Sequence, residues 1–120
     1  MKEDINEEQL VDRIVGLIQS KKGFDIKIFD LKGLASFADY FIICSADADI
    51  QVKAIADEID KELRKEGIKS YHREGYNTLN WVLLDYFDVV VHVFRKDTRE
   101  FYNLEKLWGD AEIKEIPNEF

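Results

Sequence analysis

The fold is decided by residues 80–94, which read NWVLLDYFDVVVHVF. Branched and aromatic side chains fill both halves of this stretch, and such residues favour β-strands. Strands are therefore predicted over residues 80–85 and 88–94, with a tight turn around Tyr86 and Phe87 between them. We expect the two strands to pair as an antiparallel hairpin.

The two faces of this hairpin differ in chemistry. For a turn of two or four residues, Leu84 is predicted to lie opposite Val89, and Val82 opposite Val91. Side chains alternate between the faces of a strand, so one face is purely aliphatic and is expected to join the core. That face holds Val82, Leu84, Val89, Val91 and Val93. The other face holds Trp81, Leu83, Asp85, Asp88, Val90 and His92.

The mixed face has the composition of a docking patch, since a large aromatic side chain stands among charged neighbours. Asp85 and Asp88 are predicted to face each other, and a basic group of a partner would relieve their repulsion. His92 can hydrogen-bond near Trp81 and so shape the patch. The alternative is that a helix covers Trp81, which then has no role in binding.

Hydrophobic periodicity predicts the elements outside the hairpin. Helices are expected from Asn6 to near Gly23, from an N-cap at Asp47 to Gly67, and from Asp97 or Thr98 to Leu107. Strands are expected over residues 24–31, 39–45 and 68–74. The sequence therefore predicts an α/β fold with a single mixed β-sheet of about five strands and flanking helices. Residues 1–110 are expected to form one domain, followed by an acidic, frayed tail over residues 111–120.

Composition excludes several classes of function. The formal net charge of −8 disfavours nucleic acid and anionic membranes as main targets and favours a basic protein partner. Apolar runs fall short of the ~20 residues needed to span a bilayer, and Cys44 has no second cysteine with which to form a disulfide. Because the N-terminus does not resemble an export or import signal, we expect a cytoplasmic protein.

Four segments resemble, in order, the ribosomal silencing factor family, also called Iojap-like. They are SFADYFIICS at 36–45, QVKAIA at 51–56, WVLLDY at 81–86 with DVVVHVF at 88–94, and REFYNLEKLWGD at 99–110. The resemblance implies a sheet of nucleotidyltransferase-like topology without catalytic residues, no enzymatic activity and no cofactor. It also implies binding to the large ribosomal subunit through its fourteenth large-subunit ribosomal protein, at the intersubunit face. Such binding would block association with the small subunit and repress translation under nutrient limitation.

The resemblance also implies a homodimer in many members and a contact surface around the tryptophan of the hairpin. Carried onto this chain, the partner-binding residues are Trp81, Leu83, Asp85, Tyr86, Asp88, Glu100 and Tyr102. Trp81 would be the desolvated anchor of this surface. The three carboxylates would pair with lysine or arginine of the partner.

The chain departs from the family pattern at two places. Phe87 replaces a glycine that usually precedes Asp88, and a phenylalanine does not readily adopt positive φ in a tight turn. Asp47 and Asp49 replace small and hydroxyl residues, which leaves open a metal-dependent nucleotidyltransferase-like enzyme. A third hypothesis is a dimeric scaffold whose Trp81 face serves self-association.

Three further groups of residues are interpreted as structural. His72 and His92 lack the partners that a metal site needs. Phe101, Leu104 and Trp108 share one stripe of the last helix and are expected to be core. Arg95, Lys96 and Arg99 are interpreted as a solvated helix start, since acidic residues interrupt them.

Overall fold

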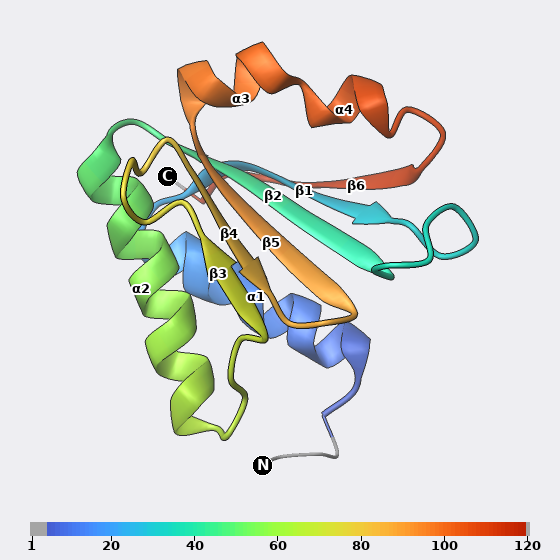
Figure 1. The fold of residues 1–120 in the computed structure, drawn as a ribbon, viewed down its shortest axis with the longest axis horizontal. Helices are drawn as coiled ribbons and strands as arrows, with labels where there is room; N and C mark the ends of the chain where they lie inside the picture. Colours follow the sequence, from blue (N-terminus) through green and yellow to red (C-terminus); the bar gives the residue numbers. More distant parts are fainter. Residues whose placement is uncertain (1–4, 120) are drawn as a thin grey trace.

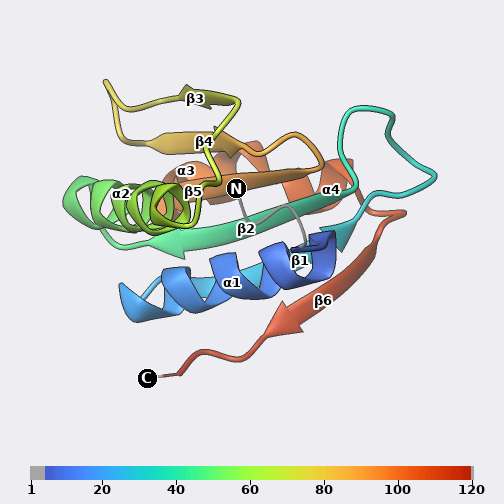
Figure 2. The same cartoon turned by 90° about the horizontal axis from the view of Figure 1, so that it is seen from below.

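Six strands form one mixed sheet in the computed structural model, which describes residues 5–119. They are β1 (Phe24–Asp30), β2 (Tyr40–Ala46), β3 (His72–Glu74), β4 (Trp81–Asp85), β5 (Val89–Arg95) and β6 (Glu112–Ile116). The strand order is β3-β4-β5-β2-β1-β6, and Figure 2 shows the strands in this order from top to bottom. Only β2 and β5 run parallel to each other; the other neighbours are antiparallel.

The helices divide between the two faces of the sheet (Figure 1). They are α1 (Glu7–Ser20), α2 (Asp49–Lys65), α3 (Lys96–Tyr102) and α4 (Leu104–Leu107). The long α1 and α2 pack on one face, and the short α3 and α4 lie over the other. Among the described residues, no helix is both long enough and apolar enough to cross a membrane.

The start of α1 is confirmed at atomic detail. The side-chain oxygen of Asn6 accepts a hydrogen bond from the backbone N–H of Gln9 at 2.8 Å, and the Gln9 side chain accepts one from the backbone N–H of Asn6 at 2.9 Å. This reciprocal capping box satisfies two backbone donors that a helix start otherwise leaves unpaired. The predicted N-cap of α2 is wrong: α2 begins at Asp49 after Ala48, and the backbone N–H of Asp47 donates to Gln51 instead.

The aliphatic face of the hairpin is in the core, as predicted. Its five residues, Val82, Leu84, Val89, Val91 and Val93, have no solvent exposure. They pack with the buried stripes of α1 and α2 in the larger of two hydrophobic clusters. The smaller cluster lies on the opposite face, where Phe29, Phe41, Phe94 and Leu104 contribute. The sheet therefore has two buried faces, but only short helices protect the second.

The predicted register of the hairpin is wrong. The predicted faces are right for the strand residues but wrong for Asp88, whose side chain lies beside Glu7 of α1. Leu84 pairs with Val91 and Asp85 with Val90, so Asp85 and Asp88 do not face each other. The backbone N–H of Tyr86 donates to the carbonyl of Val89 at 2.8 Å, which extends the ladder by one pair. The Tyr86 ring is buried among the aliphatic core, so burying it favours this longer strand.

Phe87 occupies the hairpin turn with a φ of 76°, the conformation in which glycine is favoured. Phe87→Gly is therefore expected to stabilise the protein by about 0.5–1 kcal/mol, because relief of left-handed strain outweighs the exposed ring contact with Tyr71. Urea unfolding measures the change. Phe101→Gly is the matched control: this exposed phenylalanine lies in α3, where glycine should cost about 0.5–1 kcal/mol. Equal destabilisation by both substitutions would contradict the strain argument.

The prediction of a frayed tail over residues 111–120 is wrong. Residues 112–116 form β6, which pairs antiparallel with β1 and extends the sheet at its far edge. Ile113 packs against the smaller cluster and Ile116 against the larger one. Two apolar anchors on opposite faces hold this acidic segment in the sheet.

Candidate docking surface

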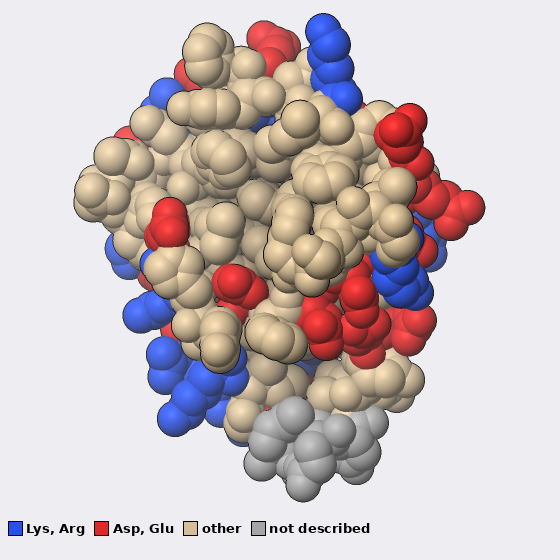
Figure 3. Space-filling view, turned by 45° about the vertical axis from the view of Figure 1, so that its right-hand side comes forward, with Lys and Arg blue, Asp and Glu red and all other residues tan. Residues whose placement is uncertain are grey.

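The second face of the sheet stays partly open because α3 and α4 are short. Trp81, Leu83 and Asp85 all lie on this face and are half-buried, while Tyr102 of α3 is 52% exposed beside them. We call these four residues the docking face. Figure 3, which turns the α4 side forward, shows a broad uncharged surface with acidic side chains gathered along its lower right edge.

Trp81 is held in place on three sides. Its ring stacks on buried Phe94 with centroids 4.7 Å apart, and the ring of Tyr102 lies 4.9 Å away. Its indole N–H donates a 3.0 Å hydrogen bond to Nδ1 of His92, so the predicted contact between the two side chains is confirmed. Tyr102 of α3 therefore covers part of the Trp81 ring, and the rest of the ring stays accessible.

His92 is a buried imidazole, with only 3% of its surface exposed. Its ring lies 4.4 Å from that of Phe41, and burial lowers the pKa of His92 to about 3. Since Nδ1 accepts the bond from Trp81, the single proton of the neutral ring must be on Nε2. Nε2 has no hydrogen-bond partner within residues 5–119. The buried His92 ring thus fixes the orientation of the Trp81 side chain through this hydrogen bond.

The structure does not bring all predicted contact residues together. The Tyr86 side chain packs in the core on the opposite face, where only 8% is exposed, so it does not reach the docking face. We therefore remove Tyr86 from the predicted set as a correction. Glu100 is exposed but lines a groove on the other flank of α3, away from Trp81.

Sequence reasoning missed several exposed apolar residues near this face. Phe101 is 81% exposed, so its predicted core position is wrong, whereas Leu104 is buried and Trp108 half-buried. The stripe is broken because Asn103 adopts a left-handed φ of 49°, which ends α3 and turns the chain into α4. Phe37, 60% exposed, lies against Trp108 with ring centroids 5.9 Å apart. The apolar surface therefore extends beyond the hairpin.

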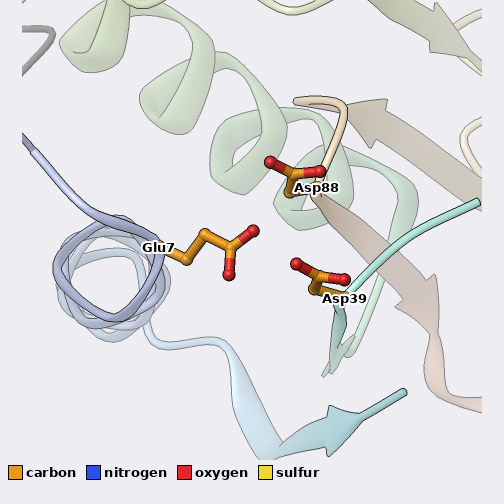
Figure 4. Close-up of side chains that lie close together, drawn as sticks. All are labelled: Glu7, Asp39 and Asp88. Carbon is orange, nitrogen blue, oxygen red and sulfur yellow. The ribbon is translucent and has the colours of Figure 1, made fainter. Parts of the chain in front are cut away.

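Asp88 belongs to a cluster of three carboxylates with Glu7 and Asp39, shown in Figure 4. One carboxylate oxygen from each lies within 4.8 Å of the others. The backbone N–H groups of Asp39 and Tyr40 both donate to the Asp88 carbonyl, which fixes the hairpin turn against this loop. A hydrogen bond with Asp39, together with burial, raises the pKa of Glu7 to about 7. Such carboxylates could ligate a hard cation, and a shared proton relieves the same repulsion.

Glu7→Gln is expected to stabilise the protein at about pH 8 by about 1 kcal/mol after allowance for solvent screening. A raised carboxyl pKa means that the folded state binds the proton more tightly, so the stabilisation is present in acid and lost as the pH rises through 7. The glutamine side chain can still donate a hydrogen bond to Asp39 but carries no charge. Urea unfolding at about pH 5 and about pH 8 measures the difference. Asp12→Asn, at an exposed carboxylate of the same helix, should leave the pH profile unchanged. If the stability of Glu7→Gln depends on pH in the same way as that of the wild type, the carboxylates of the cluster do not share a proton.

The carboxylates of the enzyme hypothesis are engaged in ion pairs. Asp47 pairs with Lys96 at 3.2 Å and Asp49 with Arg95 at 3.0 Å. They flank the ends of the parallel strands, where a groove of about 900 Å³ opens beside Ser45. The cations lining that groove are paired as well, with Lys27 and Arg99 both on Glu105. In the described chain the groove therefore offers no free cation to hold a triphosphate.

Arg99 is buried, so its prediction as part of a solvated helix start is wrong. It is 7% exposed, and its guanidinium donates to the Asp25 carbonyl at 2.6 Å, to Ser45 Oγ at 2.9 Å and twice to Glu105. The Asp25 carbonyl is turned toward it by a bulge in β1 where Asp25 has a φ of 51°. Arg99 thus joins α3 and α4 to β1 and β2. At the outer edge of the sheet, the exposed His72 side chain hydrogen-bonds to Glu74 of the same strand.

These features define a class of protein: a small α/β protein with one partly open aromatic sheet face and acidic side chains along its edge. The fold, with its mixed six-stranded sheet and helices on both faces, agrees with the predicted class apart from the extra strand.

The chain belongs to the ribosomal silencing factor family, since the family model described as "Ribosomal silencing factor during starvation" matches residues 4–119. A ribosomal silencing factor of Halalkalibacterium halodurans is 43% identical over 93% of this chain and 96% of its own length. That of Bacillus subtilis is also 43% identical, over 93% and 95%. A crystal structure of a Chromobacterium violaceum protein superposes with a TM-score of 0.84 at 33% identity and covers 87% of each chain. The family consists of silencing factors rather than enzymes.

Proposed function

We propose that this chain binds the large ribosomal subunit and prevents it from joining the small one by occupying part of the joining surface. The observation that carries the proposal is Trp81, a large aromatic side chain fixed by His92 on an otherwise open sheet face. Such rigid, half-buried aromatic residues dominate the energy of protein interfaces. Steric exclusion needs no catalytic group, only a bound surface of sufficient area.

The finer proposal concerns the contact itself. The partner is the fourteenth protein of the large subunit, met at the intersubunit face, in the cytoplasm and under nutrient limitation. Trp81 and Leu83 form the apolar centre, with Tyr102 beside them. Asp85 lies at the rim, Asp88 lies beyond the hairpin turn beside Glu7, and Glu100 lies beyond α3. These carboxylates attract basic residues of the partner and set the rate and register of binding more than its strength.

The test is co-sedimentation of the purified protein with each isolated subunit, followed by a subunit-joining assay. We expect retention on large subunits, none on small subunits, and fewer joined particles as the protein is added. The Asp85→Lys variant should bind more slowly with little loss of stability, because the half-buried Asp85 side chain accepts, within residues 5–119, a single hydrogen bond from the turn N–H of Phe87. Normal joining by saturated large subunits would rule out the proposed function.

We further propose that the free protein forms a homodimer through a surface other than the docking face. Among the strands that the structure describes, the edge strands β3 and β6 each pair on one side only, so each offers an edge for a second copy. Sedimentation velocity of wild type and Trp81→Ala separates the possibilities. Dimers in both proteins support separate surfaces, whereas dimer loss in Trp81→Ala supports a scaffold that self-associates through the docking face.

A further inference from the structure

A hollow of about 460 Å³ opens beside Trp81, between the start of β4 and α3. Three aromatic residues line it, Trp81, Phe101 and Tyr102, together with the polar residues Thr78, Asn80, Asp97 and Thr98. Phe101 and Tyr102 meet edge to face with centroids 5.1 Å apart, and Tyr102 also contacts the Trp81 ring. The hollow falls within the ~300–1,000 Å³ range of sites that receive small groups.

The aromatic walls present ring surfaces rather than hydrogen-bond donors. The only polar group of Trp81, its indole N–H, is taken by His92 on the inner side. Phe101 has no polar group, so a ligand meets π-faces and ring edges on the aromatic side of the hollow, and polar groups of Thr78, Asn80, Asp97 and Thr98 on the other side. The faces of aromatic rings carry partial negative charge and attract cations.

The cation–π contacts among residues 5–119 are made elsewhere, by Lys32 over Tyr40 and Arg73 over Tyr76. Within residues 5–119, the rings that line the hollow make no cation–π contact with lysine or arginine. Arg95 donates to both oxygens of Asp97, at 2.7 and 3.2 Å, and its remaining nitrogen reaches Asp49 on α2. The backbone N–H of Thr98 also donates to Asp97, at 2.9 Å. A carboxylate can accept about four hydrogen bonds, so Asp97, which accepts these three, has room for one further donor at the mouth of the hollow.

We propose that the hollow receives one arginine side chain of the partner, with its guanidinium against the rings of Trp81 and Tyr102 and its edge toward Asp97. This inference rests on the proposed function and names the chemistry of one contact within it. Charge complementarity favours the occupant, because the chain carries a formal net charge of −8. Arginine fits better than lysine, since its guanidinium is planar, weakly hydrated and stacks on aromatic faces. His92 is the positioning residue that keeps the indole N–H turned inward.

The direct test uses the free protein and a small probe, N-acetyl-arginine amide, followed through the indole N–H resonances by NMR. We expect a saturable shift of the Trp81 resonance, while Trp108, on the same side of the sheet but outside the hollow, serves as internal reference. The neutral isostere N-acetyl-citrulline amide should leave both resonances in place. Equal shifts with both probes, or none with either, would overturn the arginine site.

Matched substitutions separate a cation from an apolar occupant. Tyr102→Phe keeps the ring and should bind the probe and the large subunit as wild type does, whereas Tyr102→Leu should weaken both about 5-fold. Equal binding by the two variants would indicate an apolar side chain and reject arginine. His92→Asn keeps an acceptor near the Nδ1 position and should retain probe binding, while His92→Leu should lose it. A wild-type Trp81 resonance and probe response in folded His92→Leu would reject the positioning role.

The probe assay tests the arginine site, and the ribosome assay tests the proposed function, so one can be rejected without the other. If large subunits retain the protein but the arginine probe does not bind, the hollow has another occupant and the proposed function stands. If the probe binds but large subunits do not retain the protein, the hollow is a cation site and the proposed function is wrong.

Discussion

Trp81→Ala is expected to weaken binding to the large subunit at least about 30-fold, the loss that defines an interface hot spot. The substitution removes the largest side chain of the docking face and leaves Nδ1 of His92 without its donor. It also removes one wall of the hollow beside α3. Co-sedimentation over a range of protein concentrations gives the affinity, and the subunit-joining assay should lose its inhibition in parallel.

Loss of packing must be separated from loss of contact. Trp81 stacks on buried Phe94, so its removal should also cost about 2–3 kcal/mol of folding stability. Tyr76→Ala is the matched control, because Tyr76 is a half-buried aromatic packed on the α2 side of the sheet. It should show a comparable loss in urea unfolding and wild-type affinity. If both variants bind equally well, Trp81 is not part of the contact.

The aliphatic face of the hairpin was predictable because strand periodicity needs only local sequence. The same alternation places Tyr86 with Leu84 and Val82, opposite to Trp81. Strict use of that period would have excluded Tyr86 from the docking face, but the family resemblance included it. The register was not predictable, since the turn position depends on whether burying Tyr86 outweighs the strain at Phe87.

Contacts between residues far apart in the sequence could not be predicted from the sequence. β6 was missed because Ile113 and Ile116 do not alternate with polar residues in a regular pattern, and pairing with β1 decides their place. Asp88 meets Glu7, which is far away in sequence, rather than Asp85. Phe101 is exposed because Asn103 adopts a left-handed conformation and ends α3. The pattern of hydrophobic residues does not predict that conformation.

Arg99→Ala is expected to cost about 3–5 kcal/mol of folding stability, the largest loss at a single polar side chain of this protein. Its guanidinium holds the Asp25 carbonyl, Ser45 Oγ and Glu105, so one substitution leaves polar groups on three elements without their donor. Although burial acts to raise the pKa of Glu105, the Arg99 charge lowers it overall. Without Arg99, that partly buried carboxylate loses its main compensation. Urea unfolding measures the loss.

The size of this effect depends on burial rather than on the number of ion pairs. Lys53→Ala breaks an exposed pair with Asp57 at 2.7 Å, and it should cost less than about 0.5 kcal/mol because both groups stay hydrated. Arg99→Lys should recover only part of the stability, since an ammonium cannot reproduce the forked contacts to Ser45 and Glu105. Arg99→Ala should also loosen α3, which carries Tyr102, and so weaken docking through a residue that touches no partner. A stability for Arg99→Ala close to that of Lys53→Ala would mean that α3 and α4 are held by apolar contacts alone.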